Sequence, residues 1–401
     1  MTSSIGCAKQ SRQDRINSIR RLTEFMDENK EKVIRLLTGH AGYAAAAAEW
    51  QSSVKALKGA EQEVQQHVND QSVDCMAVFM PSNMVLYFYV LYLVIPSLYT
   101  QRIFFRPSSH ITEQTALLHQ LLEPVHQLPI SLQLVSQRIF IEESVSRAQL
   151  VVFTGTYKNA ELVRCRLSSN RQTYVFFGQG VNPAVVGGSA DIERAVQDLI
   201  TARMFNTGQD CMGPNVLFVH QDRAHDFSEY MRQRLSSMVF GPRHDPQADY
   251  GPIFYSSTMS TLSQYLADNA RYIQAGGTID FSKRKIEPTI LRSSLEDKPP
   301  VVEYFGPIFS IVSYRDEASL MAELDQSFYR DRAMGASVHG SPVLAKFLQA
   351  NHMVAIEQTL FDIEDGNLPF GGYGQMANYV FHAGRVKPAP ILLSQVVGEH
   401  F

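Results

Sequence analysis

Short apolar runs alternate with amphipathic segments along most of this chain, and this alternation limits its fold more than any other feature. Five apolar runs have the length and the β-branched or aromatic content of buried strands: 75–80, 101–105, 131–135, 149–153 and 173–177. Three segments with apolar residues three and four apart predict helices: 11–38, 111–122 and 191–205. Strands that alternate with helices form largely parallel sheets, so we expect an α/β fold.

The same alternation continues in the second half of the chain. We expect strands at 215–219 and 309–313 and helices at 224–237 and 317–326. A length of 401 residues suits two domains. The net charge of −4 excludes the basic surface of a typical nucleic-acid-binding protein.

The four cysteines, Cys7, Cys75, Cys165 and Cys211, form no CxxC pair, which favours free thiols in a reducing cytoplasm. The twelve histidines are scattered without an HExxH motif, so we expect no metal site. The N-terminal segment lacks the apolar core of a signal peptide.

The continuous apolar run from Met84 to Ile95 resembles a membrane helix at first sight. It holds only twelve residues and ends at Pro96, which is too short to cross a bilayer. We expect a buried helix and no stable membrane insertion, with a helix at a membrane surface as the alternative.

Cys211 is the strongest candidate for covalent chemistry. It follows a predicted helix and Gly208, in a polar loop where backbone N–H groups stabilise a thiolate. The alternative is an inert thiol. Asn83, between a strand and the apolar helix, is either an oxyanion donor or an ordinary helix N-cap.

Two glycine-containing turns are further candidates. Phe153-Thr154-Gly155-Thr156 lies between a strand and a helix, where backbone N–H groups can bind a phosphate. The turn Pro369-Phe370-Gly371-Gly372 is equally consistent with a purely structural role.

The order and spacing of these pieces resemble the aldehyde dehydrogenase superfamily over nearly the whole chain. The resemblance rests on Pro81-Ser82-Asn83, Arg106-Pro107-Ser108, Phe153-Thr154-Gly155-Thr156, Gly180-Val181-Asn182-Pro183 with Asp191, Phe205 to Cys211, Tyr250-Gly251-Pro252, Glu287 to Leu291, Glu303 to Pro307, and Pro369-Phe370-Gly371-Gly372. In the cysteine loop, the asparagine is offset by one residue from the family pattern.

The resemblance implies a fold and a set of roles. The fold would be a Rossmann-type cofactor domain (1–178), an α/β catalytic domain (179–372) and a C-terminal oligomerisation strand (373–401) in a homodimer or tetramer. Cys211 would be the nucleophile, and Asn83 would line the oxyanion hole. The implied cofactor contacts are Arg106, Ser109, Thr154, Gly155, Thr156, Glu303 and Phe305.

The chain departs from the family where hydrolytic water is activated. The family's general-base glutamate corresponds to Phe177, which cannot accept a proton. The stretch after Gly372 also lacks the family's second glutamate. A thioester on Cys211 would then persist until another thiol attacks it.

We therefore expect reduction of an acyl thioester, delivered by coenzyme A or an acyl carrier protein, to an aldehyde. Two alternatives remain open. One is oxidation of an aldehyde to an acid with a base recruited elsewhere, at Glu364 or Asp365; the other is an inactive scaffold protein.

The cofactor and substrate classes follow from neighbouring positions. Ser109 replaces an acid that often binds the adenosine ribose, which favours NADP(H) over NAD(H). Aromatic and apolar residues around the thiol indicate a hydrophobic acyl group or aldehyde, although core packing explains them equally well: Met84, Tyr87, Phe88, Phe177 and Phe370.

Overall fold

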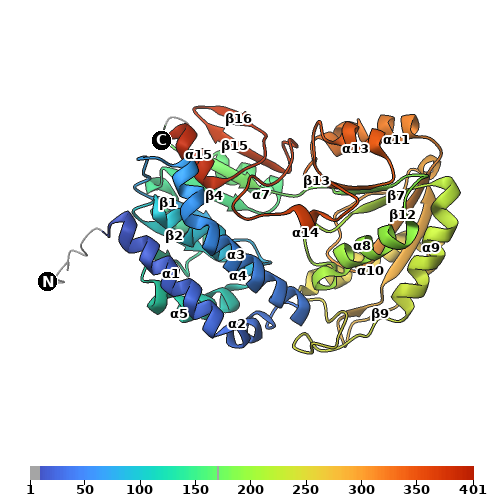
Figure 1. Ribbon diagram of the computed structural model, residues 1–401, viewed down its shortest axis with the longest axis horizontal. Coiled ribbons are helices and arrows are strands. Elements are labelled where there is room, and N and C mark those ends of the chain that lie inside the picture. The colour runs from blue at the N-terminus through green and yellow to red at the C-terminus, as the bar shows by residue number, and fades with distance from the viewer. Residues whose placement is uncertain (1–9, 169–170) are drawn as a thin grey trace.

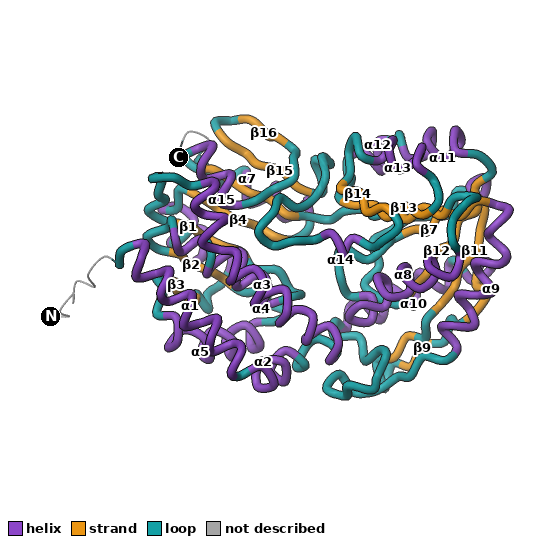
Figure 2. The backbone as a smooth tube through the Cα atoms, in the orientation of Figure 1, coloured by secondary structure: helices purple, strands orange, loops and turns teal. Residues whose placement is uncertain are grey.

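The computed structural model describes residues 10–168 and 171–401, and Cys7 lies outside these ranges. The described chain forms two seven-stranded, largely parallel sheets surrounded by helices (Figure 1). A short antiparallel ribbon joins β9 (Ile279–Asp280) to β10 (Lys285–Ile286). The two large sheets lie in opposite halves of the molecule (Figure 2), and the α/β fold expected from the alternating pattern is confirmed.

The first sheet combines strands from both ends of the chain. Its order is β16-β15-β5-β4-β1-β2-β3; neighbours among β1 to β5 are parallel, whereas β15 is antiparallel to β5 and to β16. Val78 and Val151 point to opposite faces and are both fully buried, as expected for a parallel sheet covered on both sides. The strands are β1 (Met76–Phe79), β2 (Ile103–Arg106), β3 (Ile130–Leu132), β4 (Leu150–Thr154), β5 (Thr173–Phe177), β15 (Asn378–His382) and β16 (Arg385–Lys387).

The second sheet has the order β14-β13-β6-β7-β12-β11-β8, and only the pairing of β8 with β11 is antiparallel. The earliest of its strands in the sequence is β6, which follows β5 of the first sheet after a short connection. The strands are β6 (Pro183–Val186), β7 (Val216–His220), β8 (Ile273–Ala275), β11 (Thr289–Ser294), β12 (Ile308–Tyr314), β13 (Gly335–His339) and β14 (Met353–Ile356).

Helices fill the connections between the strands. Those associated with the first half are α1 (Arg12–Glu28), α2 (Lys30–Leu37), α3 (Tyr43–His67), α4 (Val85–Tyr89), α5 (Thr112–His126), α6 (Gln137–Glu143) and α7 (Tyr157–Arg164). Those that follow are α8 (Ile192–Met204), α9 (Gln221–Ser236), α10 (Ser256–Asp268), α11 (Glu317–Leu324), α12 (Ser327–Arg330), α13 (Pro342–Leu348), α14 (Leu360–Ile363) and α15 (Leu393–His400).

The segment 11–38, predicted as one helix, is divided at Asn29. The backbone N–H and the side-chain amide of Asn29 both donate to the carbonyl of Phe25, which ends α1, and α2 begins at Lys30. Asparagine competes with the helical backbone for hydrogen bonds, and this competition accounts for the break.

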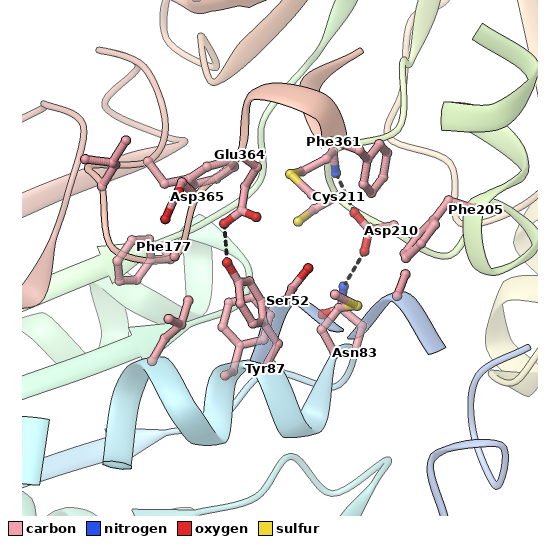
Figure 3. A pocket seen from close by; sticks show the side chains of 18 of the residues that line it. Ser52, Asn83, Tyr87, Phe177, Phe205, Asp210, Cys211, Phe361, Glu364 and Asp365 are labelled. Atoms are coloured by element: carbon pink, nitrogen blue, oxygen red, sulfur yellow. Dashed lines mark hydrogen bonds between the residues drawn. The ribbon is translucent and has the colours of Figure 1, made fainter. Parts of the chain in front are cut away.

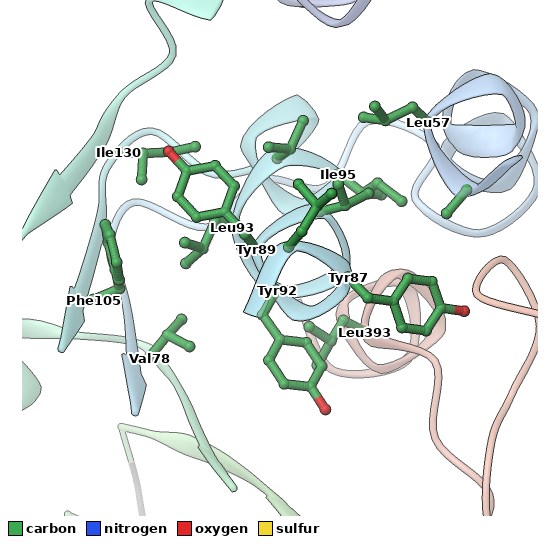
Figure 4. Close-up of a cluster of buried hydrophobic side chains, with 14 of the residues drawn as sticks. Leu57, Val78, Tyr87, Tyr89, Tyr92, Leu93, Ile95, Phe105, Ile130 and Leu393 are labelled. Carbon is green, nitrogen blue, oxygen red and sulfur yellow. The ribbon is translucent and has the colours of Figure 1, made fainter. Parts of the chain in front are cut away.

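The apolar segment after Asn83 is a buried helix, as predicted. It continues from α4 into a π-helical turn, Val90–Val94, before Pro96. In Figure 4 its side chains pack between sheet residues such as Val78 and Phe105 on one side and the helices α3 and α15 on the other. Within the described ranges, no helix combines the length and hydropathy needed to cross a membrane.

The C-terminal segment differs from its prediction. An oligomerisation strand was expected within 373–401, but Leu393–His400 at its end forms the helix α15 against α3 of the same chain. Leu393, Val396 and Val397 are buried there, three and four residues apart, which is helical spacing. Strands β15 and β16 precede this helix and extend the chain's own first sheet, so the C-terminal end lies beside N-terminal helices in Figure 1.

Candidate active site

Two cavities meet at Cys211, between the two sheets. One has a volume of about 290 Å³ and is lined mainly by apolar side chains; Figure 3 shows it from close by. The other has a volume of about 420 Å³ and is lined by many polar groups. Asn83, Phe88 and Cys211 line both cavities, so the thiol can contact a molecule bound in either.

The loop that carries Cys211 is held in an uncommon backbone conformation. Asn206 and Thr207 have φ values of 47° and 59°, in the left-handed region. Hydrogen bonds to the side chains of the loop offset the cost of this conformation. Asn206 accepts from the N–H of Gly42, Thr207 from that of Gly251, and Gln209 from that of Phe254. The polar residues of the motif therefore fix the position of Cys211.

Arg203 connects this loop to the segment that carries Glu303. Its fully buried guanidinium donates to the carbonyls of Gly208, Tyr304, Gly306 and Pro214, and no carboxylate among the described residues pairs with it. Burial lowers the pKa of Arg203 to about 10. The sequence analysis missed this residue, and its only signal was a charge at the end of a predicted amphipathic helix.

Asn182 is a second residue that the sequence analysis did not single out for its side chain. Its amide Nδ2 donates to the carbonyl of Cys211 at 2.6 Å, and its Oδ1 accepts the N–H of Gly335 at 3.1 Å. These bonds tie the nucleophile loop to the second sheet, because Asn182 immediately precedes β6.

Asn83 faces Cys211 and is not the N-cap of α4. The N-cap is Met84, with φ 49°, and Glu49 of α3 instead accepts the first backbone N–H groups of the helix, those of Leu86 at 2.6 Å and Tyr87 at 3.2 Å. Asn83 Nδ2 donates to Asp210 Oδ2 at 3.5 Å. An amide nitrogen carries two N–H groups, so the second remains available for a substrate oxygen.

The surroundings of Cys211 do not stabilise a thiolate in the way the sequence predicted. Burial, followed by the charges of Asp210 and Glu303, raises the pKa of the thiol well above its ordinary value. The sequence showed a polar loop but not the carboxylates that the fold places around it. The thiol therefore needs a proton acceptor when it attacks.

The seven predicted cofactor residues all line the polar cavity: Arg106, Ser109, Thr154, Gly155, Thr156, Glu303 and Phe305. Thr156 caps α7 by accepting the N–H of Asn159, so the helix begins at the cavity. Glu303 accepts from the amide of Gln179 at 2.8 Å, and burial raises its pKa to about 7. The structure brings these side chains together; their roles as cofactor contacts stay predictions.

The five predicted substrate residues likewise line one cavity, the apolar one: Met84, Tyr87, Phe88, Phe177 and Phe370. The ring of Phe177 stacks on Tyr92, with centroids 5.2 Å apart and planes inclined by 20°. This position offers an aromatic face and no proton acceptor. Glu364 and Asp365 also line this cavity, and Tyr87 donates to Glu364 at 2.5 Å.

Among the described residues, no group of three or more His, Cys, Asp or Glu could hold a metal ion.

Two curated proteins with similar sequences are, by name, dehydrogenases of a dial and of an aldehyde. The 4,4'-diapolycopene-4,4'-dial dehydrogenase of Cytobacillus firmus is 23% identical over 287 residues, which cover 69% of this chain and 61% of that protein. The 4,4'-diaponeurosporen-aldehyde dehydrogenase of Staphylococcus aureus is 27% identical, covering 58% of this chain and 51% of that protein. The chain thus spans about half to three-fifths of the length of these relatives.

A solved structure shows the same fold over almost the whole chain. The succinic semialdehyde dehydrogenase of Streptococcus pyogenes, solved with NADP⁺, superimposes with a TM-score of 0.82 at 16% identity, covering 94% of this chain and 89% of that chain. A sequence model described as the aldehyde dehydrogenase family matches residues 4–378. A match of that extent, on a chain whose fold agrees, shows that this protein belongs to the aldehyde dehydrogenase family.

Proposed function

We propose that this protein oxidises an apolar aldehyde to the carboxylic acid with NAD(P)⁺, through a covalent intermediate on Cys211. The observation that carries the proposal is the position of the thiol, which lies where a polar and an apolar cavity meet. The names of the relatives support this direction of reaction better than thioester reduction.

The polar cavity suits a nicotinamide dinucleotide. It contains hydroxyl groups from Ser109, Thr154 and Thr156, and the hydroxyl of Thr154 is buried without a hydrogen-bond partner among the described residues. The carboxylate of Glu303 can accept a ribose hydroxyl when its hydrogen bond from Gln179 is broken. When bound, the oxidised cofactor would supply the hydride acceptor.

The chain's own groups perform the remaining chemistry. The thiol of Cys211 gives its proton to solvent water, its sulfur bonds to the aldehyde carbon, and the carbonyl oxygen becomes an oxyanion. The free N–H of Asn83 and the backbone N–H of Cys211 would donate to that oxygen. Loss of hydride leaves a thioester on Cys211, whose hydrolysis releases the acid.

The apolar cavity sets the substrate class. Rings from four different segments surround the thiol, so burial of an alkyl or aromatic chain supplies the binding energy: Phe88, Phe177, Phe205 and Phe361. The names of the two relatives refer to a dial and an aldehyde as substrates, which agrees with an aldehyde as the substrate here. A small polar aldehyde would leave much of it unfilled.

Reduction of an acyl thioester by NADPH or NADH is the second candidate. The observation in its favour is Phe177, because a site without a hydrolytic base preserves its acyl-enzyme. Coenzyme A or an acyl carrier protein would then deliver the acyl group.

Three further features belong to the proposal for either reaction: domain boundaries at residues 178 and 372, assembly as a homodimer or tetramer, and a cytoplasmic location.

One assay separates the candidates. The protein is given NAD⁺ or NADP⁺ with a series of alkyl and aromatic aldehydes, and in parallel NADH or NADPH with acyl-coenzyme A and acyl-carrier thioesters. We expect acid from the aldehydes, lost in Cys211→Ala and retained in Cys165→Ala, which changes an exposed thiol outside both cavities. Aldehyde formed from thioesters, with no acid from aldehydes, would establish the second candidate. If neither acid nor aldehyde formed, the inactive scaffold protein would be the remaining interpretation.

A further inference from the structure

We infer that Glu364 is the general base that activates water to release the product acid from Cys211; this inference rests on the function proposed above. The family's base position holds Phe177, so hydrolysis of the acyl-enzyme needs a proton acceptor from another part of the chain. Glu364 comes from the segment after α14, far in sequence from the lost position.

Glu364 is held in the cavity in a defined orientation. Figure 3 shows its carboxylate directed into the space that the Cys211 thiol also faces. The hydroxyl of Tyr87 donates to Oε1 of Glu364 at 2.5 Å. No side-chain hydrogen bond between described residues uses Oε2, which leaves that oxygen for a water molecule.

The neighbouring carboxylates are less suited to the task. Asp365 forms an ion pair with Lys55 at 2.8 Å, and the hydrogen bond from Lys55 helps to keep the pKa of Asp365 below its ordinary value despite partial burial. Asp210 uses both oxygens, accepting from Met212 and Asn83. Glu303 lines the polar cavity and not the apolar one.

The surroundings of Glu364 also adjust its basicity. Burial raises its pKa above the ordinary value, Tyr87 opposes this by its hydrogen bond, the charges of Asp365 and Asp210 raise it, and Lys55 lowers it. The net direction is upward, toward neutral pH, where a carboxylate is a better proton acceptor than an exposed one.

The step balances without an added oxidant or reductant. The oxygen of water bonds to the thioester carbon while Glu364 takes one proton from that water. The tetrahedral intermediate then breaks its carbon–sulfur bond, which frees the acid and the Cys211 thiolate. The proton on Glu364 passes to the thiolate or to solvent, and the site returns to its starting state.

An activated ester tests this step without a cofactor. A p-nitrophenyl alkanoate would acylate Cys211 with a burst of nitrophenolate, and steady-state release would report hydrolysis. We expect Glu364→Gln to keep the burst and to lower the steady-state rate about 100-fold or more. Intact mass should then show one acyl group on Cys211. The retained burst also shows that the variant is folded.

Three further variants make the test specific. Glu142→Gln removes an exposed carboxylate that pairs with Arg138 on α6, outside both cavities, and should keep both phases. Tyr87→Phe removes the hydrogen bond that lowers the pKa of Glu364, so the acidic limb of the hydrolysis rate should move to higher pH. Asp365→Asn tests the rival carboxylate.

The outcomes distinguish this inference from the proposed function. The inference would be overturned if Glu364→Gln hydrolysed the ester in steady state as fast as the unmodified protein. It would also be overturned if Asp365→Asn lost steady-state hydrolysis and Glu364→Gln did not. A stable acyl-enzyme in the unmodified protein would overturn it and favour thioester reduction. Ester hydrolysis that depends on Glu364 without any aldehyde oxidation would support the base and overturn the proposed function.

Discussion

The carboxylate of Glu49 accepts the backbone N–H of Leu86 at 2.6 Å, and thereby anchors the first turn of α4 to α3. Glu49 is fully buried, and its second oxygen has no hydrogen-bond partner among the described residues. Because Asn83 stands just before this helix, the bond between Glu49 and Leu86, 37 positions apart, helps to fix where Asn83, the proposed oxyanion donor, lies. Burial raises the pKa of Glu49 to about 8, from an ordinary value of 4.5.

The raised pKa of Glu49 makes stability depend on pH. Between pH 4.5 and 8 the folded protein holds a proton that the unfolded chain has released, so the free energy of unfolding falls as pH rises through this window. We expect Glu49→Gln, which cannot titrate, to flatten this slope in urea denaturation measured from pH 5 to 8. An unchanged slope would contradict the assignment of the slope to Glu49. Glu63→Gln should flatten the slope as well, since burial also raises the pKa of Glu63.

Arg203 should contribute strongly to stability. Lysine has a single ammonium group and cannot reach the four carbonyls that the guanidinium joins, so buried acceptors would lose their donors. We expect Arg203→Lys to lower the free energy of unfolding by about 2–5 kcal/mol. The matched change Arg232→Lys, at an exposed pair with Glu229, should leave the free energy of unfolding nearly unchanged in the same urea titration. Equal losses of unfolding free energy in the two variants would contradict a special role of Arg203 in connecting the Cys211 loop to the segment that carries Glu303.

The carboxylate of Asp210 should slow the reaction of the thiol. Burial is the main reason for the raised pKa of Cys211, and the negative charge of Asp210 is the next. Asparagine would keep an acceptor for the N–H of Met212 while removing the charge. We expect Asp210→Asn to lower the pKa of Cys211 and to speed its alkylation by iodoacetamide severalfold at pH 7.5, measured by peptide mass mapping that separates Cys211 from Cys165. Slower or unchanged alkylation would show that the charge does not control the thiol.

Ser109 should influence the choice of cofactor. It is exposed at the rim of the polar cavity, and Arg106 lines the same cavity. A carboxylate at 109 would repel a 2′-phosphate, so Ser109→Glu should weaken the binding of NADPH about tenfold and that of NADH much less. Fluorescence titration with both dinucleotides measures this difference. Ser237→Glu, an exposed change at the end of α9, controls for added charge. Equal weakening of both dinucleotides would count against a 2′-phosphate site at 109.

Local patterns were sufficient to predict most of the secondary structure, whereas the residues of the two cavities were expected from the family resemblance. The strand at 173–177 was predicted at the boundaries of β5, because apolar periodicity and β-branched or aromatic content are properties of neighbouring residues. Glycine and asparagine positions around Cys211 could likewise be recognised from the sequence, since the turns that they form are local. The break at Asn29 and the helix α15 were missed, because one polar side chain and contact with α3 decided them.

The sequence by itself therefore determined the alternation of strands and helices and the family, and it supplied Cys211 as the proposed nucleophile. Only the tertiary structure decided what surrounds that nucleophile. Glu364 is 153 residues from Cys211 along the chain, and Glu49 and Arg203 act on segments that follow them by dozens of residues. The pKa of a buried group depends on which charges and dipoles the fold places around it, and no local pattern specifies those neighbours.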